Sequence, residues 1–151
     1  MLSSSLLRAR QTAAILGAAL GAGDAAVDDR FIELDYGDID ATPLRDVPPE
    51  MWARWRSDPD FVPPGGESLS ALQSRVETAC EEWAAEATDR DVVVVSHVSP
   101  IKAAIAWALG VGPATSWRLQ VGQAAISRVR TGPGTPAVIT FNETGHLVGV
   151  G

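Results

Sequence analysis

His97 lies at the junction between a strongly apolar segment and an expected helix. Four valines occupy positions 92–95, Ser96 and His97 follow, and Ser99 and Pro100 have the residue types of a helix N-cap and first turn. Open parallel sheets bind ligands beside the carboxyl ends of their strands, and helix N-termini favour anions. We therefore expect His97 to lie beside an anion-binding site. The alternative is a strand-end histidine whose ring is satisfied by backbone partners.

Arg8 is a second candidate for binding an anion. With Ser5 as the N-cap of the first expected helix, Arg8 falls in the first turn of that helix. A cation there opposes the helix dipole at a cost of roughly 0.3–1 kcal/mol. The position becomes favourable when a phosphate lies between the guanidinium and the helix end, because arginine binds phosphate oxygens in a bidentate manner. The alternative is a solvated surface arginine, which is what we expect of Arg10.

Two glutamates could supply a carboxyl group to such a site. Glu33 lies at the end of an expected strand, in the sequence FIELDYG, beside apolar neighbours. Partial desolvation would raise the pKa of this carboxyl, as a general acid requires, and the alternative is a surface glutamate at a strand end. Glu67, in the sequence GGES, comes just before a helix, so capping and the helix dipole alone explain it.

The elements that must position these side chains follow from hydrophobic spacing and from turn residues. A helix over 6–20 would bury Leu6, Ala9, Ala13, Leu16 and Leu20, and a helix over 68–87 would bury Leu69, Leu72, Val76, Cys80 and Trp83. The β-branched run over 91–97 predicts a strand buried on both faces. The other expected elements are a strand within 27–37, a short helix within 48–58, a helix over 99–109 and strands within 119–150.

The alternation of helices and strands predicts an α/β fold. We expect a mostly parallel sheet flanked by helices on both faces, because a strand buried on both faces needs cover on each side. A chain of 151 residues is expected to form one domain, over residues 1–151.

Composition excludes some classes of function and leaves others open. The net charge of −7 lacks the basic footprint of a nucleic-acid-binding protein, and we see no apolar run of about 20 residues that would span a membrane. An acidic balance does not exclude an anionic substrate, since a pocket needs only local positive charge. The single cysteine, Cys80, is expected to be a small core residue, and its isolation fits a reducing, cytoplasmic location. The oligomeric state cannot be predicted.

Four segments in order resemble successive signatures of the histidine phosphatase superfamily, which has the phosphoglycerate mutase-like fold. They are SSSLLRARQTAAIL, IELDYGDID, PPGGESL and VVVVSHVSPIKAAIAWALG. Each segment alone is moderately specific, and the four together in this order are strongly specific. With the C-terminal strands, the resemblance covers essentially the whole chain.

The resemblance implies a chemistry. In this family a phosphomonoester is bound by two histidines and two arginines, one histidine attacks phosphorus, and a carboxylic acid protonates the leaving oxygen. Arg8 matches a phosphate-binding arginine, Glu33 the proton donor and His97 the second histidine. Val98 stands where many relatives have glycine, so it is expected to lie against the substrate.

The resemblance implies no metal or other cofactor and a small phosphorylated metabolite as substrate. Without a long basic insertion a phosphatase is favoured over a phosphoglycerate mutase-type phosphotransferase, although the preference is weak.

One departure from the family pattern is central. Relatives begin with a strand that ends in Arg-His-Gly, whose histidine is the nucleophile, and these 151 residues do not contain that motif. The other histidine, His146, is expected to be structural. We therefore expect the first strand and helix of the fold to be missing, and negligible phosphatase turnover. Two explanations stay open: a longer natural protein with an upstream segment, or a non-catalytic remnant that binds phosphate or offers its open sheet edge to another chain.

Overall fold

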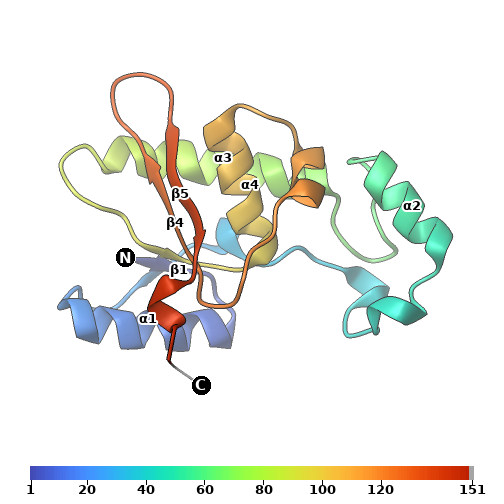
Figure 1. Ribbon diagram of the computed structural model, residues 1–151, viewed down its shortest axis with the longest axis horizontal. Coiled ribbons are helices and arrows are strands. Elements are labelled where there is room, and N and C mark those ends of the chain that lie inside the picture. The colour runs from blue at the N-terminus through green and yellow to red at the C-terminus, as the bar shows by residue number, and fades with distance from the viewer. Residues whose placement is uncertain (150–151) are drawn as a thin grey trace.

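The computed structural model describes residues 1–149, apart from the side chain of Leu44 (Figure 1). Its strands are β1 (Leu2–Ser3), β2 (Ala26–Val27), β3 (Val94–Val95), β4 (Ile126–Arg130) and β5 (Ala137–Glu143). The first three form a parallel sheet in the order β2-β1-β3, while β4 and β5 form an antiparallel hairpin. The predicted α/β class with a parallel sheet is confirmed.

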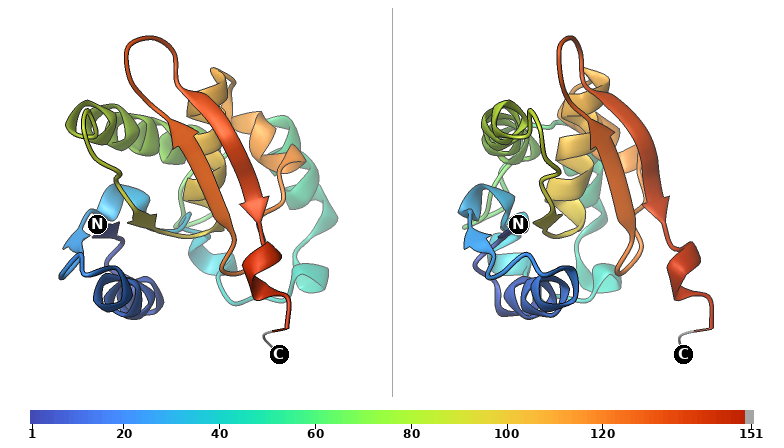
Figure 2. Two further views of the ribbon diagram at one scale, coloured as in Figure 1. Left: turned by 60° about the vertical axis from the view of Figure 1, so that its left-hand side comes forward. Right: turned by 90° about the vertical axis from the view of Figure 1, so that its left-hand side faces the viewer.

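Four α-helices surround the parallel sheet or extend from it. They are α1 (Leu7–Leu20), α2 (Pro49–Ser57), α3 (Leu69–Glu86) and α4 (Val98–Leu109), and short 3-10 helices cover Asp29–Phe31, Gly37–Ile39, Leu44–Asp46, Pro113–Arg118 and Gly145–Leu147. Helix α1 lies on the opposite side of the sheet from α3 and α4 (Figures 1 and 2). Within residues 1–149, none of the helices is both long enough and apolar enough to traverse a lipid bilayer.

The helix ends agree with the sequence analysis in some places and correct it in others. Ser68 caps α3 by accepting a hydrogen bond from the backbone N–H of Ala71. The predicted caps Ser5 and Ser99 are wrong, because α1 begins after Leu6 and α4 begins after His97. The carbonyl of His97 already accepts the N–H of Ile101 at 3.1 Å, so the first turn of α4 starts before Ser99. His97 is thus the N-cap residue itself.

The expected strand within 27–37 is largely replaced by other structure. Only Ala26 and Val27 are paired in β2, and the 3-10 helix Asp29–Phe31 follows at once. The side chain of Asp28 accepts the backbone N–H of Arg30 at 3.1 Å, which turns the chain out of the sheet. Glu33 therefore follows a short helix, and its expected place at a strand end is wrong.

Strand β3 is an edge strand of the three-stranded sheet, which corrects its predicted burial on both faces. It pairs with β1 on one side only, in the order β2-β1-β3. Val93 and Val94 are 38% and 36% exposed, respectively. The β-branched run correctly marks the strand, but full burial would require a neighbour on its outer side.

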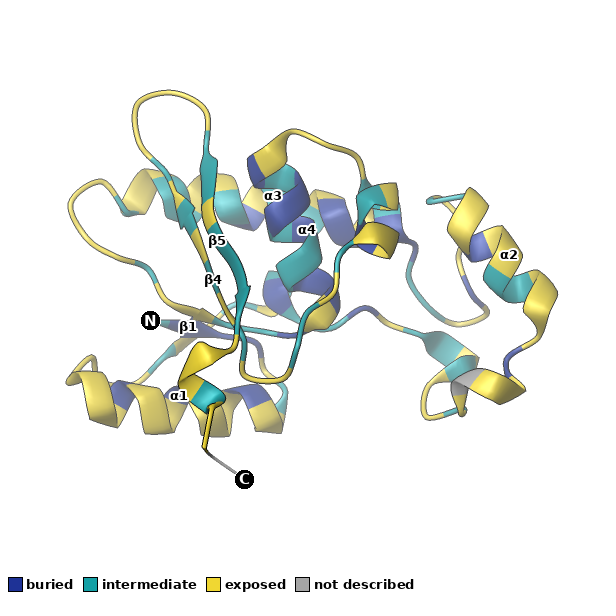
Figure 3. Ribbon diagram, in the orientation of Figure 1, coloured by how far each residue is buried: buried dark blue, intermediate teal, exposed yellow. Residues whose placement is uncertain are grey.

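The hydrophobic core lies between the sheet and α3, and it includes Leu2, Phe31, Leu72, Val76 and Ala103. Cys80 packs against this core, and burial raises the pKa of its thiol to about 12, in agreement with its expected structural role. On the other side, α1 buries only Ala9, Ala13 and Gly17, so the predicted burial of Leu16 and Leu20 is wrong (Figure 3). A Cβ at Gly17 would lie 2.3 Å from the Gly23 carbonyl oxygen, so the helix approaches its neighbours through small residues.

Candidate functional site

His97 is buried just beyond the end of β3 and forms a short hydrogen bond to the residue that follows β1. Its Nε2 atom lies 2.6 Å from Oγ of Ser4, and Ser4 is fully buried just after β1. Strands β1 and β3 are parallel neighbours, so the residues that follow them meet at one edge of the sheet. A hydroxyl can donate to a neutral imidazole nitrogen or accept from a protonated one. Ser4 can therefore fix the ring of His97 in either protonation state.

Arg8 and Glu33 act electrostatically on the same imidazole. Burial lowers the pKa of His97, the guanidinium of Arg8 lowers it further, and the carboxylate of Glu33 opposes both effects by raising it. The structure thus brings the three predicted residues into one local field, although they come from three distant parts of the sequence. The free protein favours the neutral imidazole.

Arg8 lies in the first turn of α1, as predicted, and its guanidinium is exposed. Within residues 1–149 this guanidinium forms no hydrogen bond and no ion pair. Neither Leu6 nor His97, the N-cap residues of α1 and α4, makes a side-chain cap hydrogen bond. The first-turn N–H groups of α1 and the N–H of Val98, with a free cation beside them, form an environment that favours an anion.

Glu33 is held against the start of α4. Its Oε1 atom accepts the backbone N–H of Leu34 at 2.8 Å and that of Ser99 at 3.1 Å. Ser99 is the second residue of α4, directly after Val98, and Val98 is 41% exposed. The carboxylate and the imidazole of His97 therefore lie at the same helix terminus.

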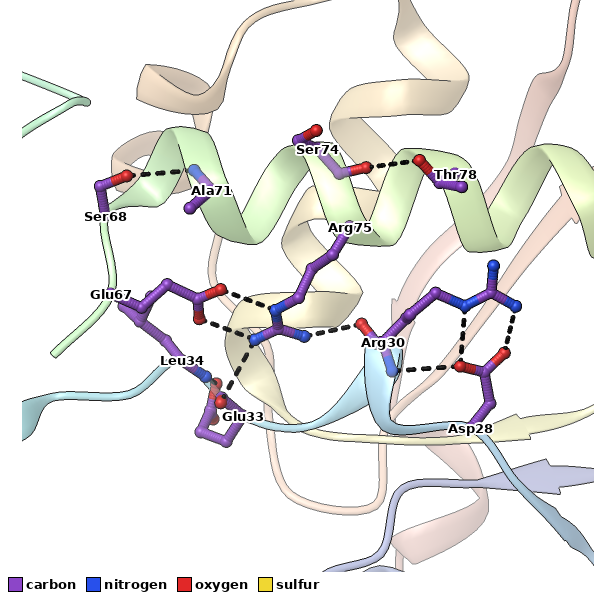
Figure 4. Close-up of polar contacts among 10 residues, drawn as sticks. All are labelled: Asp28, Arg30, Glu33, Leu34, Glu67, Ser68, Ala71, Ser74, Arg75 and Thr78. Atoms are coloured by element: carbon purple, nitrogen blue, oxygen red, sulfur yellow. Dashed lines mark hydrogen bonds and ion pairs between the residues drawn. The ribbon is translucent and has the colours of Figure 1, made fainter.

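Glu67 has a different role from the expected one. Ser68 caps α3, whereas the carboxylate of Glu67 accepts from Nε of Arg75 at 2.7 Å and from Nη2 at 2.8 Å (Figure 4). The explanation of Glu67 as a helix cap is therefore wrong.

The sequence analysis missed three further residues near the site. Ser4 follows a strand in the same way as the Ser96-His97 pair, and this parallel could have identified it. Lys102 is the single lysine of the chain and lies one turn into α4. Burial lowers its pKa, and the carboxylate of Glu33 opposes this effect only in part. The hydroxyl of Tyr36 lies 3.4 Å from Oγ of Ser99, and burial raises the pKa of that phenol.

Two cavities differ in whether residues near the candidate site line them. A cavity of 160 Å³ is bounded by Tyr36, Asp40, Thr42 and Trp52, and Tyr36 connects it to the start of α4. A more open groove of 520 Å³ runs between α3 and the end of α4, and it contains none of the site residues named above. The smaller cavity is the one that adjoins the candidate site.

Among the described residues, His146 forms no hydrogen bond to a residue of the candidate site. It lies in the 3-10 helix Gly145–Leu147, is exposed, and contacts the carbonyl oxygen of Ala124 through Nε2 at 3.0 Å. This backbone contact agrees with the structural role expected for His146.

Comparisons with known proteins give the site a context. The family model of the histidine phosphatase superfamily (branch 1) matches residues 1–144. A bifunctional protein of Mycobacterium tuberculosis is 34% identical over 151 residues, which cover 97% of this chain and 41% of that protein. Phosphoserine phosphatase 1 of Hydrogenobacter thermophilus is 32% identical over 124 residues, which cover 80% of this chain and 59% of the relative. The chain thus spans about half the length of these curated relatives.

Solved structures share the fold. The mycobacterial glucosyl-3-phosphoglycerate phosphatase in complex with inorganic phosphate superimposes with a TM-score of 0.81 at 27% sequence identity. The match covers 95% of this chain and 76% of that chain.

Proposed function

Since the chain belongs to the histidine phosphatase superfamily, we propose that it forms the phosphate-binding part of a phosphomonoester hydrolase that acts without a metal ion. The reaction would pass through a phosphohistidine. The Arg-His-Gly motif that carries the nucleophilic histidine in relatives does not occur within these 151 residues. The substrate is a small phosphorylated metabolite.

The observation that carries this proposal is the placement of His97 and Glu33 together at the start of α4, with Arg8 in the first turn of α1 near enough to influence the same imidazole. A phosphoryl group placed between the starts of α1 and α4 would receive the backbone N–H groups of the first turn of α1 and the N–H of Val98 at the start of α4. The Arg8 guanidinium and the His97 imidazole would bind its equatorial oxygens, and Val98 would lie beside it. Fixed donors of this kind stabilise the charge that a phosphoryl group carries during transfer.

Glu33 is proposed as the proton donor of the reaction. When the nucleophilic histidine attacks phosphorus and the ester P–O bond breaks, the carboxylic acid of Glu33 gives its proton to the leaving oxygen. The carboxylate then accepts a proton from the water that attacks the phosphohistidine, which restores the acid. The two bonds that hold Oε1 leave Oε2 without a hydrogen bond among the described residues, so Oε2 is free for these transfers.

The substrate class is supported by the activities of two relatives. One is a phosphoserine phosphatase and the other a glucosyl-3-phosphoglycerate phosphatase, and both of these substrates are small phosphomonoesters. Phosphatase activity is preferred over mutase-type phosphotransfer because the sequence contains no long basic insertion. The cytoplasmic location, the single domain and the lack of nucleic-acid and membrane partners also stay predictions.

A second candidate function is a non-catalytic module that binds phosphate or pairs with another polypeptide. The observation that favours it is the open outer edge of β3, where Val93 and Val94 are more than a third exposed. An unpaired strand edge offers hydrogen-bonding groups to a strand from elsewhere. If β3 pairs with a second copy, size-exclusion chromatography will show a dimer at micromolar concentration.

Both candidates predict that the pure 151-residue chain gives no metal-independent turnover of an aryl phosphate, and hydrolysis that disappears in the His97→Ala variant would contradict both. The genomic reading frame upstream of Met1 separates the two candidates. An in-frame strand pattern ending in Arg-His-Gly supports the hydrolase, and the lengthened chain should then hydrolyse aryl phosphates in the presence of a chelator. An immediate stop codon supports the non-catalytic module.

A further inference from the structure

A partly buried guanidinium, that of Arg75, holds the backbone segment that includes Glu33. Arg75, near the middle of α3, donates from Nη1 to the carbonyl of Arg30 at 2.6 Å and from Nη2 to the carbonyl of Glu33 at 3.4 Å (Figure 4). Both carboxylate oxygens of Glu67 accept hydrogen bonds from the same guanidinium, through its Nε and Nη2 atoms. One side chain of α3 thus reaches two carbonyls of the segment that follows β2.

This segment has no strand ladder that could fix its position. The carbonyls of Arg30 and Glu33 lie at and beyond the 3-10 helix Asp29–Phe31, where backbone acceptors need partners from elsewhere. The hydroxyl of Ser96 donates to the carbonyl of Phe31 at 2.7 Å from the side of β3. The backbone around Glu33 is therefore held between α3 and the strand that leads to His97.

The Glu67–Arg75 pair is better suited to precise placement than an ordinary surface pair. The side chains of Arg75 and Glu67 are only 20% and 19% exposed, and the contact is bidentate. By contrast, the pair between Arg90 and Glu86 at the end of the same helix has side chains that are 61% and 62% exposed. Exposed pairs contribute little to stability, whereas a planar guanidinium that is oriented by a carboxylate fixes the direction of its remaining donors.

We propose that Arg75, oriented by Glu67, is a positioning residue that holds the carboxyl group of Glu33 at the start of α4 beside His97. The inference rests on the proposed function, because the position matters catalytically only if Glu33 is the proton donor. Arg75 itself touches neither the imidazole nor any phosphoryl group in this scheme. It acts through the backbone of Glu33.

The test uses NMR of the 151-residue chain and needs no phosphate and no turnover, so failure of the proposed function would not affect it. The variant is Arg75→Gln, and the control is Arg90→Gln, which removes the exposed pair between Arg90 and Glu86, the last residue of α3. Glu33→Gln calibrates the full effect of losing the carboxylate. The readouts are the His97 pKa, from imidazole shifts, and the exchange rate of the Ser99 amide proton, which Glu33 binds in the structure.

We expect Arg75→Gln to lower the His97 pKa in the same direction as Glu33→Gln and to speed Ser99 amide exchange by about tenfold, as loss of a hydrogen bond to a charged group predicts. Arg90→Gln should change neither. Arg75→Lys serves if the glutamine variant does not fold, and partial shifts in the same directions are expected. If the substituted protein melts at a lower temperature but keeps the wild-type His97 pKa and Ser99 exchange rate, the pair is merely structural and the inference is overturned.

The exchange of partners, Glu67→Arg with Arg75→Glu, separates an ion pair from a positioning device. The exchanged pair can still attract, but a carboxylate at position 75 cannot donate to the carbonyls of Arg30 and Glu33. We expect thermal stability to recover in part while the two NMR readouts stay altered. Recovery of both readouts would show that the charges alone matter and would overturn the role of the guanidinium.

Discussion

The hydroxyl of Ser4 lies 2.6 Å from Nε2 of His97, and this contact joins the ends of two parallel strands that are far apart in the sequence. The contact occupies the Nε2 atom of the imidazole, and Nδ1 has no hydrogen-bond partner among the described residues. The start of α4, with Glu33 bound to its second amide, lies next to the same ring.

Replacement of Ser4 tests this contact. Ser4→Ala should reduce the free energy of unfolding by about 1–3 kcal/mol, because it leaves a buried imidazole nitrogen without a partner. Urea unfolding measures the loss, and imidazole NMR should show a changed ring environment for His97. The control is Ser5→Ala, since Ser5 is exposed and uses only its backbone N–H, toward Asp29. Equal losses for the two variants would mean that the Ser4 hydroxyl contributes nothing specific.

The Asp28 cluster predicts a loss of stability in acid. Hydrogen bonds from Arg30 are the main cause that lowers the pKa of Asp28 from 3.8 to about 2, assisted by Trp83. A carboxyl group with a lowered pKa in the folded state stabilises the fold above its unfolded pKa, and this contribution disappears as the pH falls through the folded value. The contribution is on the order of 2 kcal/mol.

Urea unfolding of wild type and Asp28→Asn, at about pH 5.5 and about pH 2.5, measures that contribution. The stability of the variant should fall less with acid than that of wild type. Asp46→Asn, which removes an exposed carboxylate paired with Arg45 at 3.7 Å, is the control and should keep the wild-type dependence. The same acid dependence in Asp28→Asn and in wild type would argue against the Asp28 assignment.

Trp55 anchors the region around α2. It is 1% exposed, stacks on Trp52, and meets Tyr36, Phe61 and Trp117 edge to face. Trp55→Ala should cost about 3–5 kcal/mol, as expected for removal of a buried aromatic ring. Trp117→Ala, at a ring that is 38% exposed, should cost clearly less.

Trp55→Phe should be the mildest of these changes, because the buried Nε1 of Trp55 has no hydrogen-bond partner among the described residues. Chemical denaturation gives the three values. If Trp55→Ala is no more destabilising than Trp117→Ala, the region around α2 does not depend on this ring.

The proton-donor role of Glu33 predicts a dependence on the leaving group. In a form of the protein that includes the nucleophilic histidine, Glu33→Gln should slow hydrolysis most for alkyl phosphates, whose leaving oxygens need a proton. Aryl phosphates with acidic phenols should be affected least. Steady-state kcat/KM values across a series of phosphate esters measure this slope. Equal slowing across the series would remove Glu33 from the acid role.

Local sequence signals placed His97 and Arg8 correctly at the starts of two helices, because a β-branched run, a helix period and a glycine stop are encoded within a few residues. The glycines that end α1 and α4 do adopt the left-handed conformation. The exposure of Leu16 and Leu20 was not predictable in this way, since it depends on how α1 approaches the sheet. The same is true of β3, whose burial depends on which strands lie beside it.

The environment of Glu33 shows a second limit of prediction. The sequence FIELDYG indicated Glu33 as a candidate proton donor at a strand end, but Asp28 and Arg30 instead turn the chain into a 3-10 helix. The partner that holds this segment, Arg75, lies more than 40 positions away from it. Contacts over such separations are set by the folded topology and have no local pattern from which they could be read.

The central claim is that Arg8 and His97 bind one phosphoryl group, and titration with inorganic phosphate tests it most directly. The imidazole NMR signal of His97 is followed in wild type, in Arg8→Gln and in Arg10→Gln, whose exposed side chain belongs to the same helix. The account predicts a saturable shift of the His97 signal, weakened about tenfold or more in Arg8→Gln and unchanged in Arg10→Gln. A wild-type shift in Arg8→Gln, or equal weakening in both arginine variants, would contradict it.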